Sequence, residues 1–251
     1  MVARTELAGG QDRPSVEFAP IEPLRAHEYV AEQIRRHIGL GLIGSGDALP
    51  PERELAKMFG VGRATIQAAL RSLESDHLIE SRRGRHGGTF VVEPQEDDAA
   101  QERLQLEIRL SRERIEDALD FRRVVEEGAV GLAAERQAAH EIAALRKLSQ
   151  QMVAAETERD FHRFDTEFHV AIALASQSEL LRGAVEQSRL ILNDAIFAQP
   201  ESEVWHKRIL REHDAMVDAI AAGDKRLAVR TMRRHLSHTE KGIRAHLTAV
   251  G

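Results

Sequence analysis

The chain has 251 residues, no cysteine and a net charge of −6 at neutral pH, with 42% apolar and 30% charged residues. This composition indicates a globular protein with a sizeable core. It excludes disulfides and thiolate metal sites, so that any bound metal would need His, Asp or Glu ligands. No apolar run approaches the roughly 18 residues of a membrane span, and the N-terminus has no apolar secretory segment. We therefore expect a cytoplasmic protein with no membrane partner.

The N-terminal third has the pattern of a winged helix-turn-helix domain, which we place at residues 23–94. Residues 1–22 mix Gly, Pro, Ser and charges without periodicity, which predicts a flexible arm. Apolar periodicity and turn residues then predict three helices and a hairpin of two short strands. The helices are expected at 24–40, 52–59 and 63–76, and the strands at 78–81 and 89–92. Gly60-Val61-Gly62 supplies the tight turn before the third helix.

The remainder of the chain is predicted to be an all-α bundle over residues 101–251, joined to the first domain by a linker at 95–100. The fold class is thus mainly α. Breaks between the helices are predicted at Gln137, Arg159, Gln177, Gln199–Glu201 and Gly223-Asp224. The helices themselves are expected at 101–110, 113–136, 138–158, 160–176, 178–198, 202–222 and 224–248.

The first domain carries a local basic patch of the kind that can hold double-stranded DNA. Residues 53–85 contain seven basic against four acidic side chains. In a helix-turn-helix the N-terminal residues of the second helix of the motif read base edges, while neighbouring residues hold phosphates. Taken singly, each arginine can equally be a solvated surface charge, but the combination of motif, basic turn and wing favours DNA. The candidate DNA-binding residues are Arg53, Arg63, Thr65, Gln67, Arg83, Arg85, His86 and Gly87.

Polar residues next to apolar helix faces suggest a metal site in the second domain. Asp165 and His169 are four residues apart, flanking an apolar stripe, and His213 and His235 lie among apolar residues of two later helices. Burying such groups costs free energy unless they have partners. One carboxylate and three imidazoles suit Zn²⁺, Ni²⁺ or Mn²⁺. The alternatives are hydrogen-bonded core histidines, or rival clusters that include His162, His206 and His238.

The segment GDALPPERELAKMFGVGRATIQAALRSLESDHLIESRRGRHGGTFV resembles the DNA-binding domain of the GntR family of bacterial transcription regulators. It departs from the family pattern at several positions. Pro51 and Gly62 replace serines, of which the second would cap the recognition helix. Gln67 stands in place of a common arginine, and Asp76-His77 replaces an acidic-Gly turn. The loss of that arginine removes a contact to guanine, so the operator sequence of relatives is not transferable.

Four further motifs resemble the effector-binding FCD domain of the FadR subfamily over roughly residues 104–240; they are DFRRVVEEGAVGLAAER, FDTEFHVAIALAS, EHDAMVDAIAAGD and MRRHL. The resemblance implies that Asp165, His169, His213 and His235 bind a divalent metal, with zinc as the first candidate and nickel or manganese as alternatives. It also brings in Arg122, whose guanidinium would suit a carboxylate effector beside the metal. The alternative for Arg122 is an ion pair with Glu126, one turn further along the same helix face.

Together these features predict a homodimeric, metal-containing transcription regulator, with repression as the expected mode. A small carboxylate effector would enter the bundle and change how the two winged domains meet a palindromic operator. One alternative is a regulator whose metal is purely structural. Another is a metal-dependent hydrolase, which is disfavoured because no separate general base stands out and because the chain carries a DNA-binding domain.

Overall fold

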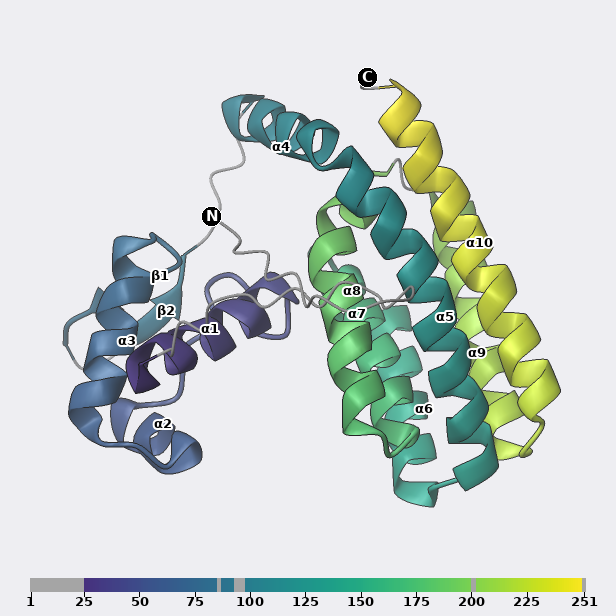
Figure 1. The fold of residues 1–251 in the computed structure, drawn as a ribbon, viewed down its shortest axis with the longest axis horizontal. Coiled ribbons are helices and arrows are strands. Elements are labelled where there is room, and N and C mark those ends of the chain that lie inside the picture. Colours follow the sequence, from purple (N-terminus) through teal and green to yellow (C-terminus); the bar gives the residue numbers. More distant parts are fainter. Residues whose placement is uncertain (1–24, 85–86, 93–97, 200–201, 250–251) are drawn as a thin grey trace, which may run out of the picture.

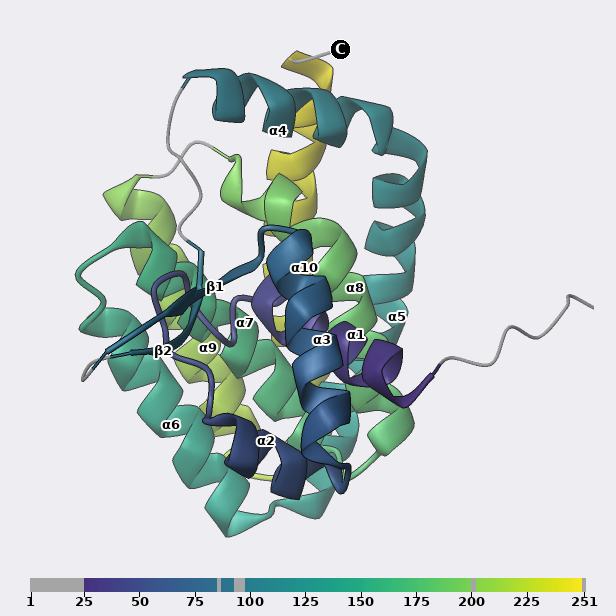
Figure 2. The same cartoon turned by 90° about the vertical axis from the view of Figure 1, so that its left-hand side faces the viewer.

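The computed structural model of the chain describes residues 25–84, 87–92, 98–199 and 202–249. Figures 1 and 2 show a small domain of helices and a hairpin beside a larger bundle of long helices. The mainly α fold class with a small β-hairpin is therefore confirmed. The arm predicted at 1–22 lies outside the described residues. Within the described ranges, none of the helices combines the length and apolar character needed to span a bilayer.

The small domain is a winged helix-turn-helix. Its elements are α1 (Ala26–Gly39), α2 (Glu52–Phe59), α3 (Arg63–Ser75), β1 (Ile79–Arg82) and β2 (Gly88–Val91). The antiparallel strands pair Ile79 with Val91 and Arg82 with Gly88, and an isolated bridge joins Ala48 to Phe90. Each strand is displaced by one residue from its predicted position. The core is formed by apolar side chains that recur at helical spacing and at alternate strand positions: Val30, Ile34, Leu55, Ile66, Leu73, Ile79 and Val91.

Two turns of this domain use left-handed backbone. Gly60 ends α2 with φ 65°, which glycine adopts without steric cost. His77, which follows α3, has φ 56°. This is the position where the family pattern has glycine, and a residue with a Cβ is strained there. At the start of α3, Gly62 provides no side-chain hydrogen bond to the helix N-terminus, as its sequence predicts.

The large domain is an all-α bundle. Its helices are α4 (Asp98–Leu110), α5 (Arg112–Arg136), α6 (Ala139–Val153), α7 (Glu158–Ala175), α8 (Glu179–Phe197), α9 (Glu203–Ala221) and α10 (Lys225–Ala249). Helix α5 packs against α7, α8, α9 and α10. Buried residues such as Ala129, Leu145, Phe168, Ile172 and Met216 form the core between them. This packing is the reason that side chains of α7, α9 and α10 can meet inside the bundle.

The helix ends confirm most predicted breaks and correct two boundaries. Gln137 and Gln177 both end their helices in left-handed conformation, with φ 46° and 50°. The break predicted at Arg159 is wrong, because α6 ends at Val153 and α7 already begins at Glu158. Thr157 starts α7 by accepting a hydrogen bond from the Asp160 N–H at 3.0 Å. Helix α4 begins at Asp98, inside the linker predicted at 95–100.

The end of α1 and the loop after it touch the bundle at α8 and α7. Arg36 Nη2 donates to the carbonyl oxygen of Gly183 at 3.1 Å and pairs with Glu186, also at 3.1 Å. The backbone of Gly39 is so near Leu190 that a Cβ there would lie 3.1 Å from its Cδ2. Helix α8 is therefore in direct contact with the DNA-binding domain.

Candidate metal and anion site

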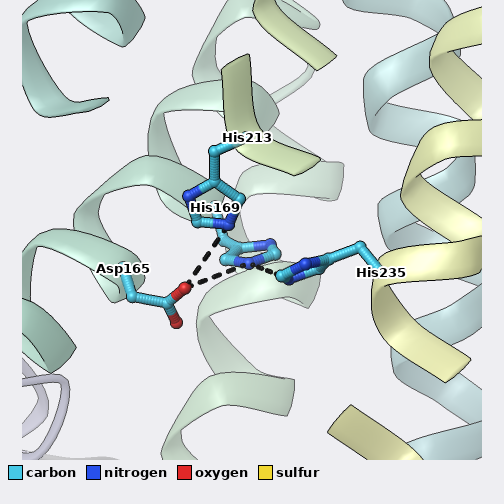
Figure 3. Close-up of side chains that lie close together, drawn as sticks. All are labelled: Asp165, His169, His213 and His235. Carbon is cyan, nitrogen blue, oxygen red and sulfur yellow. Dashed lines mark hydrogen bonds and ion pairs between the residues drawn. The ribbon is translucent and has the colours of Figure 1, made fainter. Parts of the chain in front are cut away.

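Four polar side chains from three helices converge inside the bundle. Helix α7 supplies Asp165 and His169 on one face, α9 supplies His213, and α10 supplies His235 (Figure 3). One donor atom from each residue lies within 4.8 Å of the others, and all four residues are buried. The ring of Phe168 stacks on His213 at 4.0 Å between centroids, which holds this imidazole in place.

The arrangement fits a divalent metal. The distance from His235 Nε2 to His169 Nε2 is 3.2 Å, and Asp165 Oδ1 lies 3.5 Å from His213 Nε2 and 3.8 Å from His169 Nε2. Metal–ligand bonds of about 2.0–2.1 Å place tetrahedral donors roughly 3.4 Å apart. Both ring nitrogens of His213 lack a hydrogen-bond partner among the described residues, although the ring is fully buried. A cation bound between these donors would satisfy His213 Nε2, which faces Asp165.

Outer carboxylates turn two of the imidazoles toward the centre. His169 Nδ1 is hydrogen-bonded to Glu126, and His235 Nδ1 to Glu212 at 3.1 Å. Each bond occupies the outer ring nitrogen and leaves Nε2 directed inward. Such carboxylate–histidine pairs orient metal-binding imidazoles and raise their basicity. The second oxygen of Glu212 bonds to His238 Nδ1 at 2.9 Å.

The residues of the rival clusters lie elsewhere. His238 contacts Glu212 on the outer side of the centre rather than the centre itself. His162 packs on Phe197 with 4.2 Å between ring centroids, and His206 Nδ1 bonds to the backbone oxygen of Ser202. Across the described ranges, the group with metal-ligand geometry consists of Asp165, His169, His213 and His235.

The electrostatics favour the protonation states that a metal needs. Burial lowers the pKa of His169 to about 4, although the neighbouring Glu126 opposes the shift. Burial, reinforced by His235, also lowers the pKa of His213 well below its ordinary value. Burial alone would raise the pKa of Asp165, but the guanidinium of Arg189 and the nearby imidazoles hold that pKa well below its usual range. At neutral pH the centre therefore offers the neutral imidazoles of His169 and His213 and the ionised carboxylate of Asp165.

Arg122 forms the ion pair predicted for it, and one of its other nitrogen atoms has no hydrogen-bond partner among the described residues. Its Nε donates to Glu126 Oε1 at 2.7 Å, and both side chains are buried. The pair with Glu126 is thus present. However, Arg122 Nη1 is buried without a hydrogen-bond partner in the described part of the chain. The structure leaves this donor available to another group.

A second arginine, which the sequence analysis missed, lies beside the same centre. Arg189 on α8 is completely buried; its Nη2 donates to Asp165 Oδ2 at 2.6 Å and to Thr166 Oγ1 at 2.7 Å. Its Nε and Nη1 have no partner among the described residues. The signal that could have revealed it is its position between Val185 and Leu192 on the buried face of α8.

The candidate DNA-binding residues of the winged domain lie mostly on its surface. Arg53, Arg63, Gln67, Arg83 and Gly87 are exposed. Thr65 is half-buried, and Arg85 and His86 lie outside the described residues. The carboxylate of Glu52 accepts a hydrogen bond from Gln67 at 3.0 Å and pairs with Arg63 at 3.3 Å. DNA would have to displace Glu52 from these side chains.

Comparison with known proteins assigns both domains. Residues 26–91 match the model of bacterial regulatory proteins of the gntR family, and residues 117–238 match the FCD domain. RmpR of Mycobacterium gastri, described as an HTH-type transcriptional regulator, is 34% identical over 88% of this chain and 82% of its own length. LutR of Bacillus subtilis, an HTH-type transcriptional regulator, is 27% identical over 80% of this chain and 93% of its own length.

A solved structure supports the same fold. The E. coli protein McbR/YncC superposes with a TM-score of 0.50 and 17% identity, covering 89% of this chain and 99% of that protein. RmpR and LutR are described as transcription regulators rather than enzymes, so the hydrolase alternative is set aside. The winged domain, the helical bundle and the relatives agree: this chain belongs to the GntR family of bacterial transcription regulators, with an FCD effector-binding domain at its C-terminal end.

Proposed function

We propose that this regulator is a metal-dependent repressor, active in the cytoplasm as a homodimer on a palindromic operator and released by a small carboxylate. The observation that carries the proposal is the buried convergence of Asp165, His169, His213 and His235. Two buried arginines adjoin it, in the same chain as a winged helix-turn-helix. A two-fold protein suits a two-fold DNA site, in which each α3 enters the major groove.

The four side chains would hold zinc, with nickel or manganese as the alternatives. When bound, the metal supplies a Lewis-acid position for a carboxylate oxygen. Arg122 has a different task, because its Nε is fixed by Glu126 while its Nη1 is unpaired. It would orient the effector by donating to a second carboxylate oxygen. Both roles need a ligand that is anionic at the end it presents to the centre.

The response would reach the DNA-binding domain through α8. This helix carries Arg189, which bonds to the candidate ligand Asp165. It also carries Gly183 and Glu186, which hold Arg36 of α1. A change in the position of α8 would therefore displace α1. Helix α1 in turn packs against the recognition helix α3. The effector must bind the two arrangements with different affinity for this to change DNA binding.

The decisive experiment combines metal analysis with DNA binding by the full chain. Operator fragments would be selected from genomic DNA, and elemental analysis of protein purified without chelator should find one divalent metal per chain. Carboxylic acids would then be screened by thermal shift on zinc-loaded protein, and those that stabilise it should weaken the gel shift of the selected fragment. His213→Ala should lose the metal and the response, whereas the control His140→Ala, whose side chain is 80% exposed, should keep both.

Chelation separates the effector site from a purely structural metal. If metal-free protein remains folded and binds the operator but ignores the acids, the metal belongs to the effector site. If removal of the metal unfolds the bundle and no acid changes operator binding, the metal is structural and the proposed effector role is wrong.

A further inference from the structure

Three buried side chains between α5 and α8 have hydrogen-bonding atoms without partners among the described residues. They are Arg122 Nη1, Arg189 Nε and Nη1, and both amide atoms of Asn193. All three residues are at most 2% exposed. An unsatisfied buried polar group costs about 1–3 kcal/mol, and native proteins keep only a few of them. Their concentration at one place indicates a missing anionic or polar partner.

The two arginines lie on facing helices next to the candidate metal centre, since Arg122 pairs with Glu126 and Arg189 with Asp165. Asn193 is one turn after Arg189 on the buried face of α8, and α5, which carries Arg122, packs against α8. The apolar contacts just beyond them involve Leu119 of α5 and Leu192 of α8, which bury this region against solvent. The donors therefore come from two sides: one guanidinium from α5, and a guanidinium and an amide from α8.

The charges of the centre indicate how much negative charge the missing partner carries. Arg122 is neutralised by Glu126, and Arg189 by Asp165. Glu212 has its own counter-charge in Arg234 at 3.6 Å. A divalent metal held with neutral imidazoles would then leave two positive charges uncompensated. Buried charge is unfavourable unless it is paired, so a dianion fits this centre better than a monoanion.

We propose that the effector is a small dicarboxylate, with one carboxylate on the metal and Arg122 and the other on Arg189 and Asn193. This inference rests on the proposed function of the same centre and specifies its ligand class. Two separate carboxylates suit two sets of donors that come from opposite helices, because each guanidinium has an unpaired N–H that can donate to a carboxylate oxygen. The unpaired atoms have almost no exposed area, so the ligand can reach them only when the packing around them opens.

The test compares acids of equal size and different charge on the zinc-loaded full chain. Succinate and its monoamide, succinamate, differ by one charge, and isothermal titration would give both dissociation constants; malonate and glutarate with their monoamides cover shorter and longer spacings. At the best-fitting length, the dicarboxylate should bind at least tenfold more tightly than its monoamide, and metal-free protein should lose this preference. Inorganic phosphate, a compact dianion, should bind more weakly than the best dicarboxylate.

Each outcome bears on the proposal. Equal affinity for the diacid and its monoamide, or tighter binding of phosphate, overturns the dicarboxylate assignment while leaving a carboxylate-responsive regulator. If no acid binds zinc-loaded protein, the proposed function fails and the ligand class with it. Asn193→Ala should weaken dicarboxylate binding at least fivefold with unchanged zinc stoichiometry, whereas Gln187→Ala, on the exposed face of the same helix, should change neither. If Asn193→Ala protein binds the diacid as tightly as the wild type does, the Asn193 amide does not contact the ligand.

Discussion

Glu126 connects the arginine and the histidine of the candidate centre, and its replacement by glutamine gives the sharpest prediction. The carboxylate is 1% exposed, accepts from Arg122 Nε at 2.7 Å and is hydrogen-bonded to His169 Nδ1. Glu126→Gln preserves the volume but removes the charge. One amide oxygen cannot serve both donors as well as two carboxylate oxygens do, and Arg122 is left buried without a counter-charge.

The expected magnitude follows from these contacts. Breaking a buried ion pair by removing one partner costs about 3–5 kcal/mol. Because the amide oxygen retains one hydrogen bond, we expect a smaller loss of unfolding free energy, about 2–3 kcal/mol. Loss of the carboxylate behind a metal-binding histidine typically lowers metal affinity 10–100-fold, which is about 1.4–2.8 kcal/mol. Both effects should appear, the first in metal-free protein and the second in zinc titrations.

The assay is urea unfolding of metal-free protein, together with zinc titration in competition with a chromogenic chelator. Glu127→Gln is the matched control, because the neighbouring carboxylate pairs with the exposed Arg233 and such pairs contribute about 0–1 kcal/mol. Unchanged zinc affinity in Glu126→Gln, measured on protein that remains folded, would refute the view that Glu126 orients His169 for a metal.

Three further predictions concern the DNA-binding domain and its contact with the bundle. Arg63→Ala should abolish the gel shift of a selected operator at concentrations that saturate the wild type, with an unchanged circular dichroism spectrum; an unaltered shift would count against α3 as the reading helix. His77→Gly should raise the urea midpoint, with a gain of about 0.5–1 kcal/mol, because glycine relieves the left-handed backbone at φ 56°; a loss of stability would show that the ring makes compensating contacts. Glu186→Gln weakens the hold on Arg36, so operator affinity should respond less to an effector acid while stability falls by less than about 1 kcal/mol; a full response would exclude this contact from the route.

The sequence was informative where a local rule decides the structure. Gln137 and Gln177 interrupt the apolar periodicity, and both end their helices. The four-residue spacing of Asp165 and His169 places both on one side of α7, and buried positions on α9 and α10 account for the other two histidines. These inferences depend only on helical geometry and on the reluctance of polar groups to be buried alone.

What escaped prediction depends on contacts between helices. Arg189 lies on an apolar helix face, and its ion pair with Asp165 forms only because α8 packs beside α7. Long arginines are usually read as solvent-exposed, since the charged end can reach water from a partly buried position. The break assigned to Arg159 failed for a local reason, because the hydroxyl of Thr157 caps the start of α7 two residues before that position.

One face of helix α8 carries the buried donors Arg189 and Asn193, and another face contacts Arg36 and Gly39 of the winged domain. If an acid bound beside α8 lowers operator affinity by some factor, the thermodynamic cycle requires that operator binding lower the affinity for the acid by the same factor. Half-saturation of operator-bound protein with the acid should therefore require a higher acid concentration than half-saturation of free protein. The acid concentration at which the regulator responds in a cell then depends partly on the fraction of the regulator that is bound to operator DNA.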